Sequence, residues 1–289
     1  MDVRNIKEEA PIIQDGKYLE GIWELQKKLL SGYIGKIEKD LPMYPIDMHS
    51  YKGQQVLKDF SARVVEETAE GYESTSAALN LAEKYGYNIH SMADSDFEML
   101  LNHLQNSNEE QADAVAFYVS LFLYANVDIQ DIYDYCNDRF AKGTNKYKDL
   151  NSIMSLGLSL HHREGYLMEV ENLFPLLSDD DLEDHEKDVN HVRGYIPAFT
   201  KICSKSHSLE DHMLWSVTYH INVARNFLKN KPWKQTQELT DITRYDEQIV
   251  LGFIKYMGYL AAVGFTAESL YNLFYKKHRV NIFRQTSGY

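Results

Sequence analysis

Apolar residues recur at helical spacing over most of this chain, and this periodicity constrains the fold more than any other feature. Only six prolines interrupt 289 residues, and few runs alternate valine, isoleucine or threonine with polar residues as half-buried strands do. The pattern predicts an all-α fold. The helices are expected, to within about two to four residues, at Tyr18–Glu38, Gln55–Tyr85, Ser95–Leu104, Glu109–Ala125, Ile129–Ala141, Leu150–Arg163, Leu209–Lys229, Asp246–Val263 and Ala267–Phe283.

Charge and cysteine content narrow the class of protein. The formal net charge of −13 argues against a nucleic-acid binder, because phosphate backbones require an extended basic surface. Cys136 and Cys203 lie far apart without metal-ligand spacing, as expected of a protein in a reducing cytoplasm. The most apolar run, Ala114–Val127, is shorter than a bilayer requires, so no membrane segment is predicted. The chain also contains no HExxH, GxSxG or Walker glycine loop.

One helical domain is expected over residues 1–289, since hydrophobic residues make up 44% of the chain and suffice for one large core. It divides into two halves, about 17–163 and 208–289, joined by an acidic segment at 164–207. The charge run Ser178–Asp188 within that segment lacks the glycine and ligand spacing of a calcium loop, which favours a solvated helix or linker.

The two halves show a weak internal repeat. A shift of 138 positions aligns Leu123–Phe140 with Ala261–His278 and Tyr133 with Tyr271, mainly through a shared helix-turn-helix pattern. A duplication with a degenerate second half explains the likeness, and so does chance similarity between two amphipathic helix pairs. The sequence leaves both explanations open.

Two pairs of carboxylates are candidates for a metal site. Glu67 and Glu70 are three positions apart, as are Glu110 and Asp113. This spacing places both members of a pair on one helix face, where they can share a hard cation such as Mg²⁺. Such spacings also mark solvated faces of acidic helices. Both pairs border apolar runs, however, and this favours an inward orientation, in which a metal or a proton offsets their repulsion.

The last residues of this acidic chain form a cationic, aromatic segment. Lys277 and Arg284 are seven positions apart with Asn281 between them, so one helix face could present two cations and an amide to a phosphate chain. The alternative is a basic tail that screens an acidic body.

At these residues the sequence resembles the all-α nucleoside triphosphate pyrophosphatases, in the branch of the dimeric dUTPases and phage-type dCTP/dUTP pyrophosphatases. That family has ExxE, then ExxD on the next long helix, and a C-terminal signature close to Y-x-K-x-x-x-N-x-x-R-Q-x-x-G-Y. The final segment, YKKHRVNIFRQTSGY, matches the signature, and WELQKKL at Trp23–Leu29 is similar to the family's first helix.

The resemblance implies a helical bundle of the all-α NTP pyrophosphatase type that hydrolyses a pyrimidine deoxynucleoside triphosphate: dUTP, with dUDP or dCTP as further candidates. Catalytic roles are implied for Glu67, Lys277 and Arg284. Two or more Mg²⁺ ions would be held by Glu67, Glu70, Glu110 and Asp113. The substrate would be bound by Gln26, Tyr275, Lys277, Asn281, Arg284, Tyr289, Trp233 and Lys234. The resemblance further implies a homodimer in the cytoplasm, that of the host if a phage encodes the chain.

One departure from the family concerns the lysine/tryptophan segment Lys229–Gln235. In the family this segment follows ExxE and precedes ExxD, whereas here it lies about 120 positions after ExxD, as counted from the sequence. Trp233 and Lys234 therefore contribute either to one site shared by both halves or to a second, inactive one. The displaced segment also supports an alternative function, a non-catalytic nucleotide sensor or partner-binding protein that retains the fold.

Overall fold

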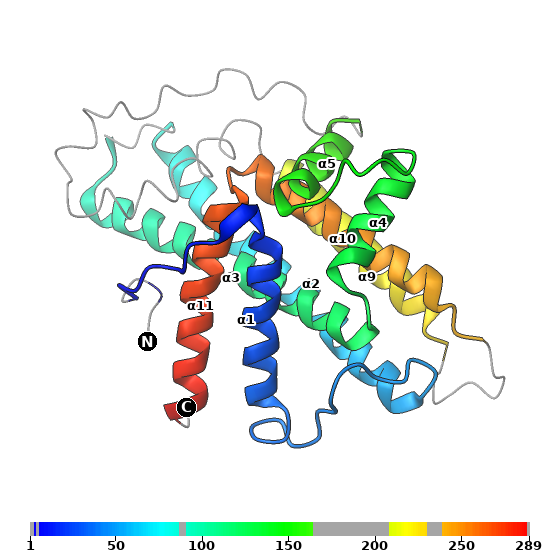
Figure 1. Cartoon of the computed structure of the whole chain (residues 1–289). Helices are drawn as coiled ribbons and strands as arrows, with labels where there is room; N and C mark the ends of the chain where they lie inside the picture. The colour runs from blue at the N-terminus through cyan, green and yellow to red at the C-terminus, as the bar shows by residue number, and fades with distance from the viewer. Residues whose placement is uncertain (1–2, 4–5, 87–90, 164–207, 230–238, 288–289) are drawn as a thin grey trace.

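The computed structural model describes residues 3, 6–86, 91–163, 208–229 and 239–287, and in these residues it contains eight α-helices and no β-strand (Figure 1). The predicted all-α fold is confirmed. The helices are α1 (Tyr18–Tyr33), α2 (Tyr51–Lys84), α3 (Asp94–Ala125), α4 (Ile129–Phe140), α5 (Leu150–Arg163), α9 (Ser208–Phe227), α10 (Ile242–Ala262) and α11 (Ala267–Ser287).

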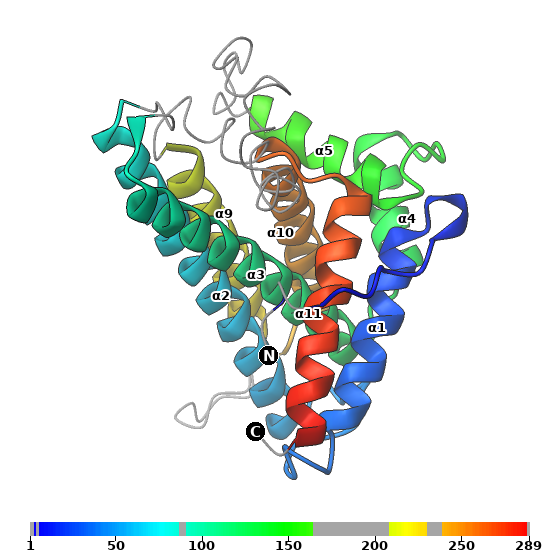
Figure 2. The same ribbon diagram turned by 90° about the vertical axis from the view of Figure 1, so that its left-hand side faces the viewer.

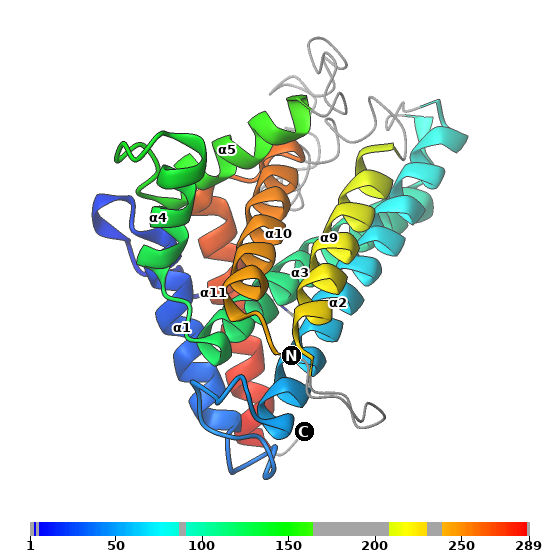
Figure 3. The same ribbon diagram turned by 90° about the vertical axis from the view of Figure 1, so that its right-hand side faces the viewer.

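The two long helices α2 and α3 pack against each other over most of their length, and α9 lies alongside both α2 and α10 (Figure 3). Helix α11 packs on α1 and also contacts α3. In Figure 2, α1 and α11 run together on one side of the molecule, with α10 between them and the group α2, α3 and α9. The first and last helices of the chain are therefore neighbours, both close to α3.

Aromatic side chains on α3 and α10 fill the centre of the core. Tyr118 and Tyr256 are fully buried with ring centroids 5.7 Å apart, and Phe122 and Phe253 meet edge to face at 5.3 Å. Burying one such ring removes a large apolar area from water and contributes about 1.5–3 kcal/mol. The most apolar run of the sequence, Ala114–Val127, supplies the α3 half of this cluster.

Two sharp corners recur at positions 138 residues apart. Helix α4 begins at Ile129 and α11 at Ala267, and the helix before each turns into it at 94° and 102° respectively. The central pair Tyr118 and Tyr256 has the same separation in the sequence. Duplication of the two halves stays a prediction, but the geometry extends the weak sequence repeat to the helix starts and to one core contact.

Local chemistry explains both corners. Asn126 adopts a left-handed conformation with φ of 62° after α3, and Asp128 caps α4 through a hydrogen bond from the Asp131 backbone N–H. At the second corner Gly264 has φ of 103°, which favours glycine. Thr266 and Ser269 then exchange side-chain to backbone hydrogen bonds of 3.1 and 2.9 Å, so the predicted stop and new helix start there are confirmed.

Two predicted boundaries were wrong, and that of α2 differs within the expected two to four residues, each for an identifiable reason. The two helices expected at Ser95–Leu104 and Glu109–Ala125 are one continuous helix, α3, because neither proline nor glycine interrupts the residues between them. Helix α1 ends at Tyr33 instead of Glu38, since Gly35 takes a positive φ of 71°. Helix α2 begins four residues early because Ser50 caps it by accepting from the Gly53 N–H.

Some predictions lie outside the described residues: the acidic segment 164–207, Trp233, Lys234, Cys203 and Tyr289. Within the described part of the chain, no single helix has the length and apolar character needed to cross a membrane. Two sharply bent helix pairs meet the same length and composition test only when taken together.

Helices α5 and α10 cross at Gly157 and Gly258, where a Cβ on either residue would overlap the other helix's backbone. We expect Gly258→Ala to lower the free energy of unfolding by about 1–3 kcal/mol through overpacking. Ser155→Ala, on the exposed side of α5, should change it by less than about 0.5 kcal/mol. Urea denaturation followed by circular dichroism measures both. An unchanged or higher stability of Gly258→Ala would contradict the close crossing.

Candidate functional site

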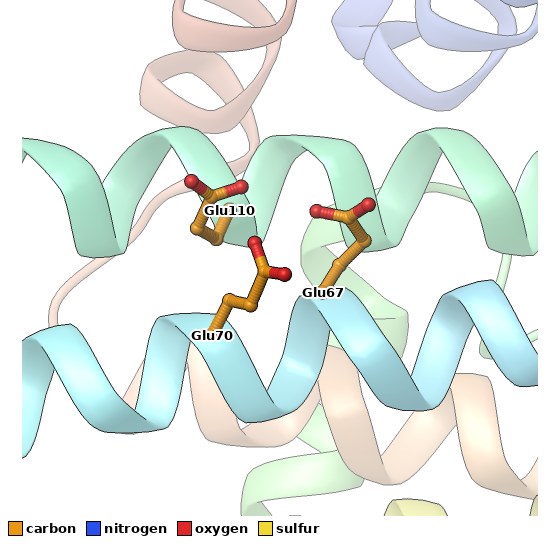
Figure 4. A group of neighbouring side chains, drawn as sticks. All are labelled: Glu67, Glu70 and Glu110. Atoms are coloured by element: carbon orange, nitrogen blue, oxygen red, sulfur yellow. The ribbon is translucent and has the colours of Figure 1, made fainter.

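Three glutamates from two neighbouring helices form an acidic cluster. Glu67 and Glu70 project from one face of α2 toward Glu110 on α3 (Figure 4), and one carboxylate oxygen from each lies within 4.8 Å of the others. The helices approach closely here because Gly71 faces Gln111, whose amide nitrogen would be only 2.7 Å from an added Cβ. The structure thus brings together three of the four predicted metal ligands.

The fourth predicted ligand, Asp113, adjoins this cluster but is engaged by a cation from α11. Lys277 Nζ lies 3.0 Å from Asp113 Oδ2 and 3.1 Å from Glu109 Oε2. The Lys277 side chain is only 7% exposed, so the ammonium group is buried between two carboxylates. The C-terminal helix therefore brings Lys277 into a direct ion pair beside the acidic cluster, whereas the sequence pattern predicts that this cation faces a phosphate chain.

Burial and mutual repulsion perturb the pKa values of these acids. The pKa of Glu67 rises from 4.5 to about 8, chiefly because the carboxyl is desolvated, and further because of the negative charges of Asp113, Glu110 and Glu70. Burial also raises the pKa of Glu110 and of Asp113, while the positive charge of Lys277 opposes both shifts. Strongly shifted acids that repel one another in a cluster are typical of functional sites.

The donor set of the cluster suits a hard divalent cation. Its atoms are carboxylate oxygens without a thiolate or imidazole among them, and such oxygens are the preferred protein ligands of Mg²⁺, Mn²⁺ and Ca²⁺. A divalent cation would also offset the repulsion that raises the pKa of Glu67. The cluster can therefore hold a metal ion, and nothing in its composition favours a softer one such as zinc.

A pocket of about 110 Å³ opens beside the cluster, bounded by α1, α2, α3 and α11. Asp113 contributes to its wall, so the pocket and the carboxylates are contiguous. The apolar rings of Phe60 and Phe117 line part of it, and the side chain of Arg63 lies over both rings at 5.5 and 5.6 Å from their centroids. An aromatic wall next to polar groups is typical of a small-molecule site.

Gln26, which lines this pocket, has an unused acceptor. Ser120 Oγ donates its single proton to the Ala116 carbonyl at 3.0 Å, so it must accept the 2.9 Å hydrogen bond from Gln26 Nε2. This assignment fixes the orientation of the Gln26 amide. Its Oε1 is buried without a hydrogen-bond partner among the described residues, a costly arrangement that a ligand N–H would relieve.

The C-terminal residues separate into those that reach the site and those that do not. Asn281 lines the pocket, and Arg284 is exposed but close enough for its charge to oppose the rise in the pKa of Asp113 that burial causes. Tyr275, predicted to bind substrate, lies elsewhere: its hydroxyl donates to Glu8 Oε1 at 2.7 Å. Tyr275 is two positions before Lys277, so the two side chains project from different faces of α11. The signature match could not distinguish these faces.

Among the described residues of the second half, no matching acidic cluster is found. At the repeat shift, Glu110 corresponds to Gln248 and Asp113 to Leu251. Gln248 Oε1 is hydrogen-bonded to His220 Nδ1 at 2.9 Å. A neutral amide and an apolar side chain thus occupy these two positions. In the described residues, the predicted carboxylates come together in the first half of the chain.

Sequence reasoning missed Glu109, Arg63, Phe117 and Ser120. Once the cluster is known, helical spacing relates three of them to it: Arg63 is one turn before Glu67, Phe117 is one turn after Asp113, and Glu109 is one turn before Asp113. No sequence motif marked these residues, because none of them belongs to ExxE or ExxD.

Fold and site together define an all-helical protein in which a partly exposed cluster of three glutamates adjoins a buried lysine–carboxylate ion pair and a pocket. The chain matches no described protein family, and no curated protein or solved structure shows detectable similarity to it.

The shifted pKa of Glu67 predicts a pH-dependent stability in the absence of metal. Between pH 4.5 and about 8 the folded protein keeps a proton on Glu67 that the unfolded chain releases. The free energy of unfolding should therefore fall as the pH rises through this window. In Glu67→Gln this contribution is absent, so the fall should be shallower.

Urea denaturation at about pH 5 and about pH 9 measures this difference in slope. Glu66→Gln is the matched control, because this neighbouring carboxylate is exposed and should follow the wild type. Identical slopes in all three proteins would contradict a proton held by Glu67.

Proposed function

We propose that this protein catalyses the Mg²⁺-dependent hydrolysis of a pyrimidine deoxynucleoside triphosphate, with dUTP as the first candidate and dUDP or dCTP next, to the monophosphate and pyrophosphate. One observation carries the proposal: carboxylates of α2 and α3 gather in one cluster, the adjoining Asp113 on α3 pairs with a buried cation on α11, and a pocket whose lining includes Gln26, with its unsatisfied acceptor, lies beside them. The carboxylates would hold a metal, the lysine would face a phosphate chain, and the pocket would hold a base.

The acidic cluster would hold the metal through Glu67, Glu70, Glu110 and Asp113. When bound, Mg²⁺ would lower the pKa of a coordinated water molecule and neutralise the charge of the phosphates. After burial, the charges of Asp113, Glu110 and Glu70 also raise the pKa of Glu67, and a bound cation would relieve this repulsion. At neutral pH, metal binding at Glu67 would release its proton.

The cations of α11 would serve the phosphate chain. Lys277 is buried at the edge of the cluster, and Arg284 lies further along the same helix on the exposed side. Charge-assisted hydrogen bonds from such groups stabilise negative charge that develops during phosphoryl transfer. Asn281 lies between them in sequence and lines the pocket, so one helix would contact both the phosphates and the nucleoside.

The pocket would take the base. Its volume of about 110 Å³ suits a single ring better than the two fused rings of a purine. Gln26 Oε1 requires an N–H donor, which uracil offers at N3 and cytosine at its exocyclic amine. Asn281, which also lines the pocket, can supply a further donor or acceptor, and this second contact would discriminate between the two pyrimidines.

A screen of the common deoxynucleoside di- and triphosphates with Mg²⁺, scored by monophosphate release, tests the reaction and the base together. We expect dUTP to be turned over faster than dCTP, and purine nucleotides to be poor substrates. Glu67→Gln and Asp113→Asn should abolish turnover while remaining folded, because each removes a metal ligand from a site that tolerates loss of negative charge.

Full activity of either variant would refute the metal assignment. Comparable rates with dATP or dGTP would refute a pyrimidine pocket. Tight nucleotide binding without turnover in the wild type would instead favour the non-catalytic sensor.

Substitutions on α11 distinguish positioned cations from bulk charge. Lys277→Ala and Arg284→Ala should each lower kcat/KM by roughly 100-fold, the scale of losing one preorganised donor. Arg279→Ala removes the same charge, but Arg279 pairs with Glu8 at 3.0 Å, away from the cluster, so its effect should be small. Equal losses in all three variants would mean that the segment acts only through its net charge.

A further inference from the structure

Glu109 is the carboxylate of this site that belongs to no sequence motif. It lies four positions before Asp113 on α3, so both project from the same helix face. The Lys277 ammonium bridges them, at 3.1 Å from Glu109 Oε2 and 3.0 Å from Asp113 Oδ2. Of these two carboxylates, only Asp113 is a proposed metal ligand, so the lysine and a metal ion compete for it.

The orientation of Glu109 is fixed from its other side. Gln105 Nε2 donates to Glu109 Oε1 at 2.8 Å, which leaves Oε2 directed at Lys277. The Glu109 side chain is 18% exposed and that of Lys277 is 7% exposed. Removing the only partner of a buried charge is costly, but an ammonium that leaves Asp113 here would keep Glu109 as its counter-ion.

We propose that Glu109 is a positioning residue that retains Lys277 while Asp113 exchanges the lysine for a divalent cation. The inference rests on the metal role of Asp113 in the proposed function. Without metal, Lys277 is the counter-ion of Asp113 and opposes metal entry. Held by Glu109 alone, the same ammonium is free to turn toward a phosphate chain, and Asp113 is free to bind the metal.

A double-mutant cycle on metal affinity tests this exchange. Isothermal titration with Mg²⁺, without nucleotide, is performed on the wild type, Glu109→Gln, Lys277→Gln and the double variant. Lys277→Gln should bind Mg²⁺ more tightly than the wild type, because the competing cation is gone. Glu109→Gln should weaken binding about tenfold in the wild-type background and about twofold or less in the Lys277→Gln background.

A purely electrostatic role of Glu109 predicts a different result. If its charge only attracts the cation, Glu109→Gln weakens binding equally in both backgrounds, and the proposal is overturned. It is also overturned if Lys277→Gln binds Mg²⁺ no more tightly than the wild type. Glu66→Gln, an exposed carboxylate on α2, is the matched control and should have a small effect in both backgrounds. Lys277→Met, of similar length, replaces Lys277→Gln if that variant does not fold.

Turnover of dUTP, measured on the same proteins, separates this inference from the proposed function. A non-additive cycle in a protein without turnover supports the exchange and rejects the pyrophosphatase. An additive cycle in a protein that hydrolyses dUTP rejects the exchange and leaves the pyrophosphatase standing. A wild type that binds no Mg²⁺ overturns the inference directly.

Discussion

The ion-paired contact between α11 and α3 is the interaction on which the rest of the site depends. Lys277 brings a positive charge into a region where burial alone would lower its pKa, and the neighbouring carboxylates Asp113 and Glu109 raise that pKa above its usual value instead. The lysine and the acids thus make each other's burial tolerable. The same contact holds the last helix of the chain against the third, where Asn281 reaches the pocket.

The packing of the core explains why the site can contain so much charge. A layer of buried aromatic side chains on α3 and α10, including Tyr118 and Phe253, provides apolar stabilisation close to the acidic cluster. The Tyr256 hydroxyl is hydrogen-bonded to the Gln111 side chain, one residue after Glu110 on α3. A rigid helix pair therefore supports the carboxylates, and preorganised groups of this kind hold a ligand with little further loss of entropy.

Helical periodicity predicted most of the fold and part of the site. It located the carboxylate pairs and Lys277 because spacing along one helix determines which side chains share a face. It could not locate Arg63, or the engagement of Lys277 by Glu109, because these depend on how different helices pack. The family resemblance, and not periodicity, assigned Tyr275 to the site, whereas the Tyr275 hydroxyl donates to Glu8. Contacts between distant helices are tertiary properties that a single sequence does not specify.

The contact between Tyr118 and Tyr256 carries a consequence for how the chain could have evolved. If the halves arose by duplication, these two tyrosines are copies of one ancestral residue, and each now packs against its own counterpart at 5.7 Å. A substitution in one copy alters the environment of the other, so the two would diverge slowly. Glu110 and Gln248 lack such a mutual constraint, which would let one copy specialise while the other became a scaffold.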